Sequence, residues 1–92
     1  MMTSFRILNI PDRRCFEAAL SAVSSKYDVL GSSLALQDGT LYGATITLRK
    51  AENLKSAIQA VEDLRNGKSA LQVDRTFNGL TVLYSPHNAS IE

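Results

Sequence analysis

The stretch LGSSLALQDGTLYGATITL, residues 30–48, decides the fold of this 92-residue chain. Asp38-Gly39 stands between two runs of alternating apolar residues, which is the strongest short-range signal of a β-hairpin. A two-residue turn of Asp38 and Gly39 would leave both faces of the hairpin apolar. A three-residue turn that begins at Gln37 would gather the apolar side chains on one face. Because a slip of one residue moves every side chain to the opposite face, the pattern favours the three-residue turn.

An amphipathic helix is predicted on each side of this hairpin. The stripe of the first helix follows an N-cap at Asp12 and consists of Phe16, Ala19, Leu20, Val23 and Tyr27. The second helix ends at Asn66-Gly67, a left-handed stop, and its stripe consists of Leu54, Ala57, Ile58, Val61 and Leu64. Each helix is apolar along one side only, which indicates that it packs on a sheet.

Further strands are predicted near the two ends of the chain. Residues 5–10 form the first strand, with Phe5 and Ile7 on one face and Arg6 and Leu8 on the other. Pro11 is expected to end that strand. Near the other end, an Asn-Gly turn separates two short runs that read as strands, residues 71–73 and 80–84.

The resulting element order indicates the α+β class. Strand, helix, strand, strand, helix, strand is typical of the ferredoxin-like split βαβ sandwich (βαββαβ), a four-stranded antiparallel sheet with two helices on one face. We expect a single domain over residues 3–84 and a flexible C-terminal tail over residues 85–92.

Composition excludes several classes of protein. Ten basic and nine acidic side chains give a net charge of +1, so no strong bulk attraction to nucleic acid or anionic membrane is expected. No apolar run approaches the roughly 18 residues of a membrane helix, and the start lacks the pattern of a signal peptide. One cysteine makes neither an internal disulfide nor a cysteine-rich metal site. We therefore expect a soluble intracellular protein, cytoplasmic or nuclear, without metal or cofactor.

From about Phe5 to Tyr84 the chain resembles the RNA recognition motif. The segments that carry the resemblance are Phe5–Pro11, Ser25–Tyr27, Tyr42–Ile46, Ala57-Ile58 and Phe77–Leu80. Members of that family stack bases on aromatic rings of the two central strands. Here the corresponding positions hold Arg6, Gly43 and Thr45, so any RNA binding implied by the resemblance would depend on Arg6, Arg49 and neighbouring loops.

The sheet face opposite the helices is the main candidate site. Its predicted binding residues are Arg6, Leu8, Leu41, Thr45, Thr47, Arg49 and Leu83. Apolar points on a flat face of small residues indicate docking of another protein or of a second copy of the chain. A solvated sheet face would show a similar pattern, because such faces tolerate a few apolar residues.

Two weaker features lie at the start of the first predicted helix. Arg13 and Arg14 could bind an anion with the help of free backbone N–H groups. Cys15 could be a reactive thiolate beside these cations, although packing as a small residue is the favoured interpretation. The only histidine, His87, falls in the predicted tail, so no base is placed near this thiol.

These features rank three functions. The first is a small non-catalytic binding or regulatory module that acts through protein–protein contacts on the open sheet face or the helix surfaces. The second is a degenerate binder of single-stranded RNA. The third is a small oligomeric enzyme with an active site at a subunit interface, although no acid–base pair is evident and no catalytic residue is predicted.

Overall fold

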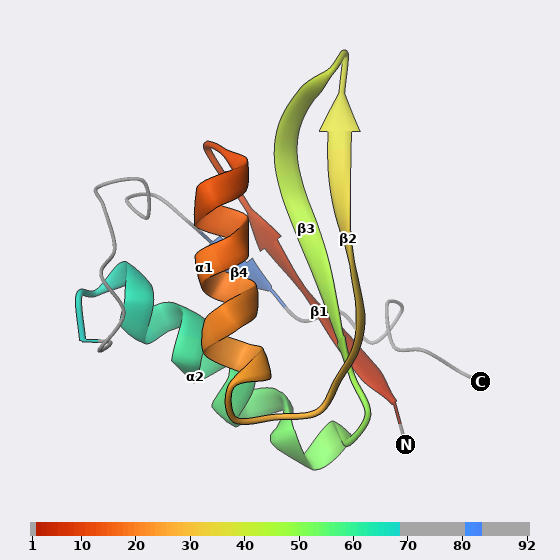
Figure 1. Cartoon of the computed structure of the whole chain (residues 1–92), viewed down its shortest axis with the longest axis vertical. Coiled ribbons are helices and arrows are strands. Elements are labelled where there is room, and N and C mark those ends of the chain that lie inside the picture. The colour runs from red at the N-terminus through yellow and green to blue at the C-terminus, as the bar shows by residue number, and fades with distance from the viewer. Residues whose placement is uncertain (1, 69–80, 84–92) are drawn as a thin grey trace.

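The computed structural model describes residues 2–68 and 81–83 (Figure 1). In chain order the elements are β1 (Thr3–Leu8), α1 (Arg13–Ser24), β2 (Val29–Gln37), β3 (Thr40–Leu48), the short 3-10 helix η1 (Ala51–Asn53), α2 (Leu54–Arg65) and β4 (Thr81–Leu83). The described strands form one sheet in the order β2-β3-β1-β4, and every neighbouring pair is antiparallel. This confirms the predicted ferredoxin-like α+β fold. The predicted strand over residues 71–73, the Asn-Gly turn after it and the predicted tail lie outside the described residues.

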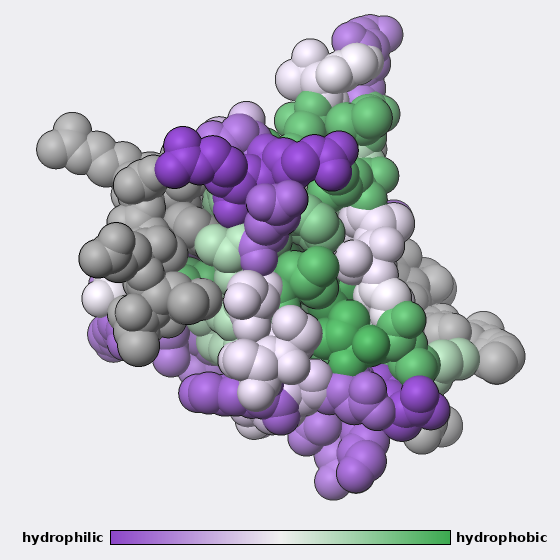
Figure 2. Space-filling model, viewed as in Figure 1, coloured by the Kyte–Doolittle hydropathy of each residue, from purple (hydrophilic) through white to green (hydrophobic). Residues whose placement is uncertain are grey.

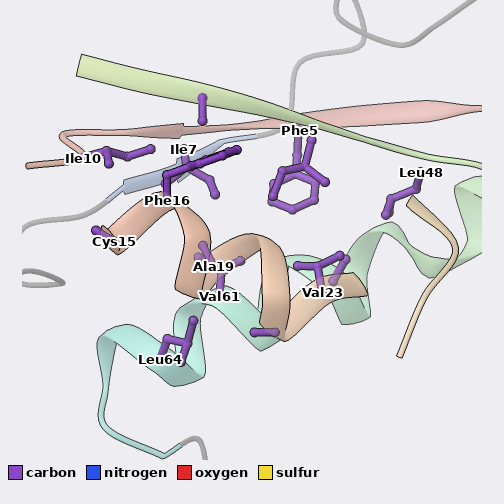
Figure 3. Packing of buried hydrophobic residues seen from close by; sticks show 14 residues of the cluster. Phe5, Ile7, Ile10, Cys15, Phe16, Ala19, Val23, Leu48, Val61 and Leu64 are labelled. Atoms are coloured by element: carbon purple, nitrogen blue, oxygen red, sulfur yellow. The ribbon is translucent and has the colours of Figure 1, made fainter. Parts of the chain in front are cut away.

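The core lies between the sheet and the two helices, which cover the same face of the sheet (Figures 1 and 3). The central strands β1 and β3 direct Phe5, Ile7, Ile46 and Leu48 into it, and each of these side chains is fully buried. Phe5 lies opposite Ile46 in the sheet. Figure 3 shows Phe5 and Ile7 directed toward α1 and α2. The predicted alternation along the first strand is therefore confirmed.

Both helices follow their predicted stripes and caps, except that α1 ends at Ser24 and Tyr27 packs against the core beyond the helix. The Asp12 carboxylate accepts a hydrogen bond of 2.8 Å from the backbone N–H of Cys15, which satisfies a donor that the first turn of α1 leaves free. Gly67, at a φ of 72°, lies in the left-handed region just after α2, as the Asn-Gly stop predicted. None of the helices in the described part of the chain is long and apolar enough to cross a membrane.

The prediction of a three-residue hairpin turn was wrong. Gln37 pairs with Thr40, so Asp38 and Gly39 alone form the turn, and their φ angles of 53° and 79° are those of a type I′ turn. The register then shifts between Leu36 and Ala35, because Tyr42 is an extra residue on β3.

This bulge changes the alternation of side chains between β2 and β3 by one residue, which is the effect that was expected of a three-residue turn. Beyond it, Leu34 lies opposite Ala44 and packs against the core, so the apolar residues are still gathered on the helix side. A second shift, between Val29 and Gly31, makes Leu30 the extra residue on β2.

The first strand ends earlier than predicted. β1 stops at Leu8 because Asn9 takes a left-handed conformation, with a φ of 63°, which does not continue a strand. Ile10 follows this bend and is buried, so it contributes to the core without belonging to the strand. The predicted end at Ile10, just before Pro11, is therefore two residues too late.

Candidate functional site: the open sheet face

Most of the described part of the open face, by which we mean the sheet face opposite the helices, consists of cross-strand rows in which small residues predominate. The rows run from β1 through β3 to β2, and they are Leu8–Gly43–Ala35, Arg6–Thr45–Ser33 and Ser4–Thr47–Gly31. Only Leu8 and Arg6 are long side chains in these rows. Ser4 is almost fully buried, so the accessible part of this flat surface lies around Arg6 and Leu8, which stand out from it.

A shallow depression lies in this surface. It is lined by Arg6, Leu8, Ala35, Gly43, Ala44 and Thr45. Its floor exists because Gly43 has no side chain: a Cβ atom there would lie 3.1 Å from the Ile7 carbonyl oxygen and 3.4 Å from Leu8 Cδ2. The first distance is tighter than ordinary van der Waals contact. Gly43 thus permits close approach of β1 and β3 and leaves room above the sheet.

Arg6 provides the charge at this depression. Its side chain is exposed, and no ion pair joins it to another described residue. It lies beside Thr45 of β3, while its backbone faces Leu83 of β4. The Leu83 side chain, which the sequence placed among the binding residues, is outside the described part of the chain.

Of the other predicted binding residues, one lies on the core side of the sheet and one lies beyond the end of its strand. Leu41 sits opposite Leu36 and packs against the core cluster, because the bulge at Tyr42 reverses the alternation of β3 before that point. Arg49 follows the end of β3, and its Nε donates to the Asp28 carboxylate at 2.6 Å. The structure thus brings together Arg6, Leu8, Thr45 and Thr47 from the predicted set.

The predicted anion site at the start of α1 gains no support. Arg13 and Arg14 are the first two residues of the helix and both are exposed. However, the Asp12 carboxylate already bonds the N–H of Cys15, so a negative charge occupies the position that an anion would take. A second anion there would meet repulsion.

Cys15 is a packing residue. It is almost fully buried within the core cluster, beside the start of α1. Burial, and to a lesser extent the negative charge of Asp12, raise the pKa of its thiol to about 11. A reactive thiolate requires the opposite shift, so the interpretation of Cys15 as a small buried residue is the one that the structure supports. Within residues 2–68 and 81–83, no group of acidic, histidine and cysteine side chains could hold a metal ion.

The predicted binding residues include the long side chains at the depression, Arg6 and Leu8, but not the smallest residues that form it. Ala35 and Gly43 line the depression but were not among the predicted binding residues. The signal was the position of Gly43, a residue without a side chain on a central strand beside Leu8.

The chain matches no protein-family model, and no curated protein is significantly similar to it in sequence.

Proposed function

We propose that this protein is a non-catalytic binding module that engages a protein partner through the open face. The observation that carries the proposal is the depression floored by Gly43, which places the Leu8 side chain and the Arg6 guanidinium on one continuous surface. An apolar side chain beside a cation with no described ion pair gives a partner both contact area and a fixed orientation.

The chemistry of the depression indicates which partner segment it would take. Ala35, Gly43 and Thr45 carry little bulk, so an extended segment or a helix can approach the sheet closely. A carboxylate on that segment would pair with Arg6, and a small apolar side chain would contact Leu8. Arginine is also among the residues that most often dominate interface energies.

The site is held rigidly. Arg6 lies between Phe5 and Ile7, both fully buried, and the strand that carries them has neighbours on both sides. Alanine, glycine and threonine lose little side-chain entropy on being covered. Docking on this face would therefore immobilise few rotamers, which lowers the cost of binding.

Capture by the immobilised chain from an extract of its source cells tests this proposal. We expect Arg6→Glu to reduce the captured partner about tenfold or more, because it reverses the charge that fixes the partner's orientation. Arg13→Glu is the matched control, since Arg13 is an exposed arginine on α1 and its replacement changes the net charge equally. Equal losses with both variants, or loss of the captured material on nuclease treatment, would contradict the proposal.

A second candidate function is binding of single-stranded RNA in the manner of the family that the sequence resembles. The observation in its favour is the exposed guanidinium of Arg6 at the family's first-strand stacking position, since bases also stack on guanidinium planes. We expect Arg6→Ala to weaken RNA binding and to reduce its salt dependence. Arg49→Ala should matter less, because Asp28 already pairs with that side chain. Fluorescence anisotropy of a labelled single-stranded RNA oligonucleotide at low salt tests this function. If the oligonucleotide does not bind under these conditions, the function is excluded.

A further inference from the structure

The outer edge of β2 is unusually unprotected. Among the described strands β2 lies at one end of the sheet, and its nine residues, VLGSSLALQ, contain neither a charge nor a proline. Proteins normally protect an edge strand with charged side chains, proline or a very short length, because its unpaired backbone groups recruit other strands. The missing protection is the first sign that this edge is an interface.

Exposed hydrophobic residues point to the same edge. Leu30 and Leu36, 38% and 60% accessible, are the two large hydrophobic side chains that the described residues leave exposed, and both belong to β2. In Figure 1 the tip of the β2–β3 hairpin extends past the N-terminal end of α1. Figure 2 shows hydrophobic surface just below the polar tip of this hairpin and again toward the start of β2, with nearly neutral surface between them. An antiparallel copy of such a strip would match it end to end.

We propose that β2 pairs antiparallel with β2 of a second copy of this chain, about a two-fold axis at Ser33, so that the two sheets become one. This register places Leu30 opposite Leu36 of the second copy and Ser32 opposite Leu34. Ser33 then faces its own equivalent. Each exposed leucine is thereby covered by the other, which a two-fold axis at Ser32 or at Leu34 does not achieve.

The backbone agrees with this register. Gln37 and Thr40 close the two-residue turn as a pair, so alternate residues of β2 turn their N–H and C=O groups away from β3. Counting back from the turn, these are Leu36, Leu34 and Ser32. Pairing about Ser33 sets outward-facing groups against outward-facing groups, as an antiparallel ladder requires.

The acidic charges at the two ends of β2 are partly offset in this register. The same register brings Asp38 of one copy level with Asp28 of the other. Asp28 is already ion-paired to Arg49, whose side chain is 58% exposed, so Asp38 would approach a pair that includes a cation. Strand pairing at this edge involves neither Arg6 nor Leu8, so self-association and the proposed partner binding depend on different residues.

Sedimentation velocity of the full chain over a range of concentrations tests the proposal. We expect a reversible dimer whose dissociation constant rises about tenfold or more in Ser33→Lys, because two lysines would then face each other across the axis. Ser21→Lys is the matched control, since Ser21 is also an exposed serine but lies on α1. A wild-type chain that is monomeric at all concentrations would overturn the proposal, and so would a dimer equally sensitive to both substitutions.

Cross-linking reports the register independently. Under mild oxidation Ser33→Cys should form a covalent dimer, because the two equivalents lie directly opposite each other, whereas Ser21→Cys should not. The native Cys15 is buried and does not interfere. A dimer that persists in Ser33→Lys and fails to cross-link at residue 33 would place the interface elsewhere. Failure of the partner capture with Arg6→Glu would leave both of these results unchanged.

Discussion

Replacing Phe5 with alanine is expected to lower the free energy of unfolding by about 3–5 kcal/mol. The Phe5 side chain is fully buried on a central strand, opposite Ile46 and facing both helices, so its loss leaves a cavity that the rigid sheet cannot close (Figure 3). Domains of this size are stable by only about 5–15 kcal/mol, so much of that stability would be lost. Urea denaturation followed by circular dichroism measures the change.

The adjacent residue is the control for this substitution. Arg6 is exposed on the opposite face of the same strand, so Arg6→Ala should change the unfolding free energy by no more than about 0.5 kcal/mol. A loss below about 1 kcal/mol for Phe5→Ala, or similar losses for both variants, would show that the alternation of β1 is assigned to the wrong faces.

Alkaline pH is expected to destabilise the wild type relative to Cys15→Ala. Because burial raises the pKa of the Cys15 thiol from 9.0 to about 11, the unfolded chain loses this proton at a lower pH than the folded chain. The contribution is fully present below the unfolded pKa of 9.0 and is lost as the pH rises through the folded value. The difference between these two pKa values corresponds to a free energy of about 3 kcal/mol.

Denaturation curves of both proteins between these two pKa values measure that difference. Other groups titrate in the same range, but their effects are common to the two proteins and cancel in the comparison. The native thiol should also react slowly with alkylating reagents until the chain unfolds. Parallel pH profiles for the two proteins, or rapid alkylation of the folded chain, would contradict the placement of Cys15 in the core.

The fold followed from the sequence because its strongest signals are local. Asp38-Gly39 marks the hairpin, Asp12 caps α1 and Gly67 ends α2, and each acts through backbone geometry that a few residues determine. The hydrophobic pattern indicated that one extra residue was needed between the two strands, but it did not show that this residue is Tyr42 in β3 and not a third residue of the turn.

The extra residue at Tyr42 explains why part of the predicted binding set was assigned to the wrong face of the sheet. Counting alternate positions from Gly43 backward assigns Leu41 to the open face, and the bulge returns it to the core side. Positions beyond the bulge, such as Thr45 and Thr47, were assigned to the correct face. The ion pair of Arg49 with Asp28 was not predicted, since it joins segments that no local pattern connects.

Amide chemical shifts of the isotope-labelled chain, recorded with and without the captured partner, test most directly whether the open face is the binding surface. Binding there predicts the largest shifts at β1 and β3, centred on Arg6, Gly43 and Thr45, with α1 and α2 nearly unchanged. The Arg13→Glu variant should give the same pattern as the wild type. Shifts concentrated on the helices, with the central strands unaffected, would contradict the proposed function.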